Sequence, residues 1–130
     1  MPKFLHTDVL DNGLQYIIDM AAGNVDLLLI NGYTQGDSYA TVDAARVMTI
    51  DLAAIDMSLG NQGTLGRRLT IVEKSGIASA QATNPDLHIA IVDVTNSEVL
   101  ATTDETGDAD VAVSDPKTIP TFDIRMNQPV

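Results

Sequence analysis

Three carboxylates near the end of the chain have the spacing of a cation site. Asp104, Asp108 and Asp110 stand four and two residues apart, as do positions one, five and seven of a calcium-binding loop. Ala109 occupies the position where such a loop needs glycine, and position twelve is not a glutamate. We interpret the trio as a solvated acidic turn and keep a calcium ion on Asp104, Asp108 and Asp110 as the alternative.

The candidates for catalysis are fewer. His6 and His88 are the two histidines, and neither lies in a metal-binding spacing such as His-Glu-x-x-His. We expect His88 to be a partly buried, hydrogen-bonded residue of a core strand. Gly60, Gly63 and Gly66 have the spacing of phosphate-binding glycines but lack the Lys-Ser/Thr of such a loop. The members of a Ser-His-Asp triad need not be neighbours in the sequence, but the chain has no Gly-x-Ser-x-Gly motif that would support such a triad. We predict no enzyme, no catalytic residue and no cofactor.

The overall charge restricts the partners. Seven cations stand against eighteen acids, which gives a net charge of -11. Nucleic acids and anionic membranes need clustered Lys and Arg, so neither is an expected partner, whereas a basic protein surface is. Cysteine is absent, which removes disulfides and thiolate zinc sites. Arg67 and Arg68 are the one adjacent pair of cations, suited to a partner's carboxylates or to protecting an edge strand.

The strongest structural pattern is a hairpin over residues 83–103. In its first strand, nearly all of the odd-numbered residues from 87 to 91 and of the even-numbered residues from 88 to 94 are apolar. Because successive side chains of a strand point to opposite faces, this strand needs cover on both faces. We expect the rest of a sandwich on one face and an N-terminal helix on the other. Asn96 is expected at positive φ in the turn.

That helix is predicted over residues 8–21. Its apolar side chains follow helical spacing, and Gly23 or Asn24 is expected to end it in the left-handed conformation. The apolar positions are Leu10, Leu14, Ile17, Ile18 and Ala21. We predict that residues 1–130 form a single domain. It begins with an extended arm, residues 1–6, and ends with a short tail, residues 127–130.

Short strands with frequent turns make up the remainder. We predict strands at about residues 25–30, 48–52, 67–73, 77–82 and 119–126, a short helix at 41–47, a turn at Ser75–Gly76 and a turn-rich connection at 60–66. The fold class is therefore mainly β, an antiparallel sandwich or small barrel with one N-terminal amphipathic helix, and α+β is the alternative.

Two tyrosines stand out in the polar loop of residues 31–39. Tyr33 and Tyr39 are two of only five aromatic residues in the chain. They either pack over the edge of the core or contact a partner, since tyrosine is enriched at interfaces.

Several segments carry a family resemblance. The run FLHTDVLDNGLQYI at residues 4–17 is the most specific, and residues 33–41, 87–93 and 119–124 extend it over nearly the whole chain. The sequence resembles small virion structural proteins of tailed bacteriophages. The resemblance implies a capsid decoration or cement protein that binds the major capsid protein, self-associates on the capsid, and is found on the phage head and in the host cytoplasm during assembly.

No catalytic residues follow from this resemblance. Phe4 and Leu5 are the expected apolar anchors of the arm on a neighbouring subunit, beside Tyr33, Tyr39, Arg67 and Arg68 as partner-binding residues. Two other functions remain alternatives. One is a tail or head–tail connector component. The other is a surface glycan- or receptor-binding module whose tyrosines stack on sugar rings.

Overall fold

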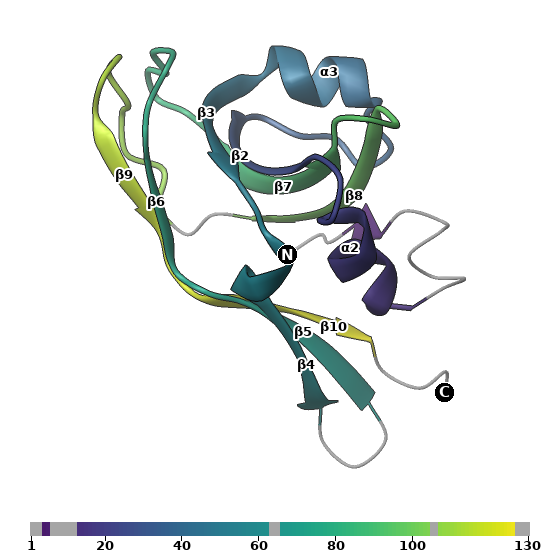
Figure 1. The fold of residues 1–130 in the computed structure, drawn as a ribbon. Coiled ribbons are helices and arrows are strands. Elements are labelled where there is room, and N and C mark those ends of the chain that lie inside the picture. Colours follow the sequence, from purple (N-terminus) through teal and green to yellow (C-terminus); the bar gives the residue numbers. More distant parts are fainter. Residues whose placement is uncertain (1–3, 6–12, 63–65, 105–106, 127–130) are drawn as a thin grey trace.

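The computed structural model describes residues 4–5, 13–62, 66–104 and 107–126. Antiparallel strands dominate it, with two short α-helices and one turn of 3-10 helix (Figure 1). The predicted mainly-β fold is confirmed.

A five-stranded sheet forms the body of the molecule. Its strand order is β1-β8-β7-β2-β3, and every pair is antiparallel. The bounds are β1 Phe4–Leu5, β2 Val25–Asn31, β3 Arg46–Asp51, β7 Leu87–Asp93 and β8 Glu98–Asp104. Strand β7 lies in the middle and is buried at every residue, so the predicted central hairpin is confirmed. Its turn places Ser97, not Asn96, at positive φ.

The other strands form a long, bent ribbon. β5 (Gly66–Ile71) pairs with β10 (Phe122–Met126), and β6 (Lys74–Ile77) pairs with β9 (Pro116–Ile119). The register is the same on both sides of the bend, because Ile71 pairs with Phe122 and Lys74 with Ile119. Pro120 lies at the bend, where its missing N–H removes a ladder bond. β4 (Met57–Gln62) adds a third strand to β5 after the 3-10 turn Ala54–Asp56.

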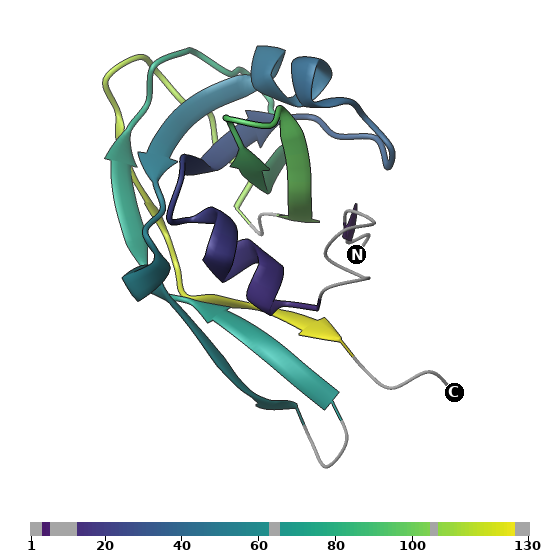
Figure 2. The ribbon, with the colours of Figure 1, turned by 45° about the vertical axis from the view of Figure 1, so that its right-hand side comes forward.

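Each face of the body sheet has its own cover. The ribbon and helix α2 (Gln15–Met20) enclose the larger core with the Leu87, Ile89 and Ile91 face of β7. Helix α3 (Tyr39–Ala44) covers a smaller core on the opposite face (Figure 2). The N-terminal helix therefore lies on the ribbon side. Our expectation that it covers the face opposite the rest of the sandwich is wrong, because α3 covers that face.

The described part of the N-terminal helix is shorter than predicted. Gly13 has φ +72°, so α2 begins only at Gln15, and the predicted start at residue 8 lies outside the described residues. Its end also differs, because Ala21 keeps right-handed backbone and neither Gly23 nor Asn24 has positive φ. The second helix begins at Tyr39, two residues before its predicted start at residue 41. Ser38 caps it by accepting a 3.3 Å hydrogen bond from the Thr41 backbone N–H.

Three local predictions are wrong. The connection at 60–66 is in part strand, since β4 continues to Gln62. Ser75 and Gly76 belong to β6 and do not form a turn. Of the predicted strand at 77–82, Ile77 lies in a strand, as the last residue of β6, and the rest is irregular apart from a bridge between Ala82 and Val111. None of the helices in the described ranges has the length and apolar character to cross a bilayer.

Candidate functional site

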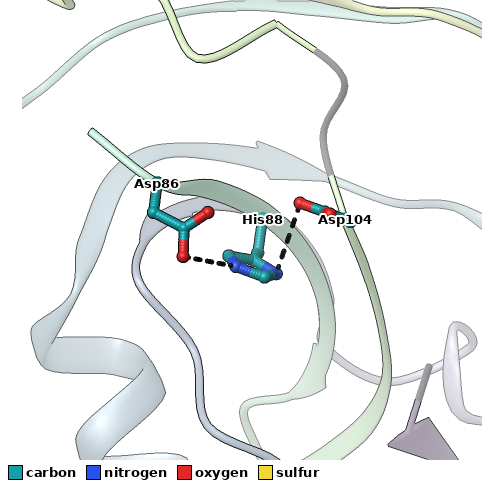
Figure 3. Close-up of side chains that lie close together, drawn as sticks. All are labelled: Asp86, His88 and Asp104. Atoms are coloured by element: carbon teal, nitrogen blue, oxygen red, sulfur yellow. Dashed lines mark ion pairs between the residues drawn. The ribbon is translucent and has the colours of Figure 1, made fainter. Parts of the chain in front are cut away.

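Asp86, His88 and Asp104 form the one three-residue cluster of possible metal ligands within the described residues. His88 Nε2 lies 3.2 Å from Asp86 Oδ2, and His88 Nδ1 lies 3.8 Å from Asp104 Oδ1. Figure 3 shows the imidazole between the two carboxylates, at one end of the β7–β8 hairpin. The cluster therefore combines a nitrogen base with two anionic oxygen groups.

Strand geometry brings these residues together. Asp86 stands two residues before His88, so the extended chain directs both toward the same side. Asp104 is the cross-strand partner of His88. That pairing depends on a bulge, because Ile91 pairs with Ala101 but Val92 pairs with Val99, which leaves Leu100 as an extra residue in β8. Without the extra residue, Thr103 would stand opposite His88.

The histidine is buried, and one carboxylate is open to solvent. The His88 side chain is 7% exposed, whereas those of Asp86 and Asp104 are 70% and 33% exposed. The Tyr33 ring lies over the imidazole, with centroids 6.0 Å apart. His88 Nε2 is buried and makes no aligned hydrogen bond within the described structure. Burial of His88 was predicted correctly, but the predicted hydrogen bonding is absent at Nε2.

This geometry places the imidazole of His88 between two anionic groups. A neutral imidazole has one N–H and one lone pair. Here a carboxylate oxygen lies beside each nitrogen, so the nitrogen that carries the lone pair has a negative charge near it. A positive charge at this point would relieve that repulsion.

The structure does not bring the predicted calcium trio together. Asp108 Oδ1 accepts a 2.9 Å hydrogen bond from the Leu87 backbone N–H, and Asp110 Oδ1 accepts a 2.7 Å bond from that of Asn84. Both carboxylates thus hold the loop before β7, and only Asp104 belongs to the cluster with His88. Sequence reasoning missed Asp86, although its spacing of two from His88 was visible.

The two tyrosines lie over the smaller core. Both are partly buried and pack against a cluster that includes Val42 and Ala90. The hydroxyl of Tyr33 also accepts a 3.3 Å hydrogen bond from the Gly36 backbone N–H. Packing over the core therefore accounts for both rings, and their role in partner binding stays a prediction.

Phe4 and Leu5 form strand β1 at the edge of the body sheet. Their backbone pairs with Thr102 and Ala101 of β8. The described part of the predicted arm thus lies against its own chain in the isolated molecule, and anchoring on a neighbour stays a prediction.

Arg67 and Arg68 lie at the start of β5, where Arg68 stands opposite Arg125 of β10. Arg67 donates a 2.9 Å hydrogen bond to Asn61 Oδ1. Asp123 Oδ2 lies 3.9 Å from the Arg68 guanidinium and 3.5 Å from that of Arg125. Strands β4, β5 and β10 hold three arginines and one aspartate, so this sheet is cationic within an acidic chain.

Two small hollows accompany these features. One, of about 120 Å³, lies between the end of α2 and the β7–β8 turn, and the other, of about 220 Å³, lies between Leu87 and β9. Both are smaller than the roughly 300–1,000 Å³ of typical small-molecule sites. Comparison with protein-family models, curated proteins and solved structures finds no significant match.

Proposed function

We propose that this chain is a virion structural protein of a tailed bacteriophage that binds the major capsid shell and stabilises it. The observation that carries the structural part of the proposal is the cationic three-stranded sheet, β4-β5-β10, which projects from the body (Figures 1 and 2). The sequence resemblance supplies the virion and the shell as the setting.

The sheet is suited to docking for two reasons. Its outer strands, β4 and β10, each pair on one side only within the described residues, so they present main-chain groups that an extended partner segment can pair with. The Arg68 and Arg125 side chains are 45% and 51% exposed. Exposed ion pairs contribute little to stability, so these arginines can exchange Asp123 for a partner's carboxylates at low cost.

The body has the opposite charge and is not the expected docking face for an acidic surface. Burial and the neighbouring Asp51 raise the pKa of the Asp26 carboxyl, the cross-strand partner of Asp51. On an acidic site of the shell the arginine end would therefore face inward, whereas a basic surface, which the net charge favours, would face the body. Many equivalent contacts on a symmetric shell then make a modest affinity sufficient.

Rebinding to stripped phage heads tests the proposal. The double variant Arg67→Glu/Arg68→Glu should bind heads at least tenfold more weakly than wild type, and wild-type binding should weaken as salt rises. Arg46→Glu is the matched control, because Arg46 is an exposed arginine of the body strand β3, and it should bind like wild type.

Head thermal stability supplies the second measurement. Heads that rebind wild-type protein should withstand a higher temperature than stripped heads. If the double variant and the control bound equally, the β4-β5-β10 sheet would not be the docking surface. If head stability did not change, the protein would not act as a cement. Counting copies per particle separates a decoration protein from a tail or connector component.

A further inference from the structure

The cluster around His88 carries negative charge with no fixed cation beside it. No lysine or arginine in the described parts of the chain forms an ion pair with Asp86 or Asp104. Because a carboxylate lies beside each ring nitrogen, either tautomer of the neutral imidazole leaves a nitrogen lone pair in negatively charged surroundings. The side chains are therefore held in an arrangement that an added cation would stabilise.

We infer that Asp86, His88 and Asp104 bind a divalent transition-metal ion. One ligand atom from each residue lies within 4.8 Å of the other two. A point equidistant from three atoms that far apart is about 2.8 Å from each, whereas zinc–nitrogen and zinc–oxygen bonds are about 2.0–2.2 Å. The Asp86 side chain is 70% exposed, so it can move the short remaining distance.

The buried nitrogen is an independent indication of a ligand. His88 Nε2 is buried without a hydrogen-bond partner, and a buried polar atom in that state is unfavourable. A metal ion on Nε2 would use the free lone pair. Asp104 supplies the third ligand atom, which lies within 4.8 Å of those of Asp86 and His88. The Tyr33 ring lies next to the imidazole, with ring centroids 6.0 Å apart.

The ligand set selects the class of ion. Calcium and magnesium prefer oxygen ligands throughout, whereas an imidazole with carboxylates suits zinc and similar transition ions. We therefore expect Zn²⁺ to bind, with Ca²⁺ binding much more weakly. This inference does not depend on the proposed capsid role, because it concerns the isolated chain.

Calorimetric titration of the EDTA-treated full chain with Zn²⁺ tests it. We expect one ion per chain and a thermal midpoint that rises with free Zn²⁺. Asp86→Asn and Asp104→Asn should each lower the affinity by about 10- to 100-fold. Asp51→Asn makes the same charge change at an exposed position of β3 and should bind like wild type. The ring proton signals of His88 should shift with Zn²⁺, a readout that does not depend on stability.

Three results would overturn the inference. They are no Zn²⁺ binding at millimolar concentration, equal affinities of Asp86→Asn and Asp51→Asn, and equal binding of Ca²⁺ and Zn²⁺. The last would indicate general attraction of cations to an acidic surface.

Discussion

Asp56 shows how a single carboxylate joins distant segments. Its Oδ2 accepts 2.9 Å hydrogen bonds from the Lys74 ammonium and from the Ala53 backbone N–H. The bond from Lys74 and then that from Ala53 lower the pKa of the Asp56 carboxyl. Both side chains are mostly buried, at 23% and 17% exposure for Lys74 and Asp56. The pair ties the turn before β4 to the bend of the ribbon.

Replacing Asp56 should therefore destabilise the fold in a pH-dependent way. Asp56→Asn should lower the free energy of unfolding by about 1–3 kcal/mol near neutral pH, because it leaves the Lys74 ammonium without its anionic partner. A carboxyl whose pKa is lowered by folding stabilises the protein above the unfolded value and loses that contribution as pH falls through the folded value. The difference from wild type should thus narrow below the ordinary carboxyl pKa of about 3.9.

Urea unfolding at a series of pH values measures this effect. Glu73→Gln removes a neighbouring exposed carboxylate and should change stability little at any pH. If the two variants were equally stable at neutral pH, the Asp56–Lys74 pair would have no structural importance.

At the same scale, the sequence predicts the burial of His88 but not the cluster around it. The alternation of β7 places His88 on a covered face, and Asp86 two residues earlier follows from the same rule. Asp104 could not be placed, because the extra residue Leu100 decides which side chain of β8 stands opposite His88. A bulge depends on how Leu100 packs in the larger core, and no local pattern encodes that.

Among the elements, β6 is the one that sequence reasoning misassigned most clearly. Ser75-Gly76 has the composition of a turn, yet both residues lie in a strand. The reason is close approach, because a Cβ added at Gly76 would lie 2.8 Å from Ile50 Cγ1 and 3.1 Å from Met48 Sδ, both on β3. Glycine is needed there for contact between ribbon and sheet, which a sequence pattern cannot distinguish from a turn.

Gly76→Ala tests that contact. The added methyl group should lower the free energy of unfolding by about 1–3 kcal/mol through overpacking. Gly107→Ala is the matched control, since a Cβ there meets nothing within 4 Å, and it should be nearly neutral. In an Ile50→Ala background, which removes Cγ1, the cost of Gly76→Ala should fall. An unchanged cost in that background would contradict the proposed clash, and urea denaturation of the four variants measures it.

The elements with strong apolar alternation were the most predictable. β2, β5, β7 and β8 match the sequence prediction closely, because one or both of their faces are buried. Elements that are held by contacts with distant segments were not predictable from the local pattern. β4 contains Gly60 and Asn61, residues that favour turns, and it is a strand because β5 pairs with it.

For the molecule as a whole, the projecting sheet and the body share one core. Leu69 of β5 and Ile124 of β10 belong to the same buried cluster as Leu27 and Ile91 of the body sheet. Shared burial predicts that the ribbon and the body unfold together, in one cooperative transition. The projection of the β4-β5-β10 sheet in Figure 1 is therefore a matter of shape and not of a separately folding unit.

Leu69→Ala tests this cooperativity from the ribbon side. Leu69 is fully buried, so its truncation should cost about 2–5 kcal/mol. Because the core is shared, the slowest-exchanging amides of β7 should lose as much protection as those of β5, measured by native-state hydrogen exchange. Ile55→Ala, at a side chain that is 91% exposed, should leave both unchanged. Loss of protection confined to β4, β5 and β10 would instead show that this sheet opens by itself. If the proposed docking role holds, ordering the sheet would then be part of the free-energy cost of binding a shell.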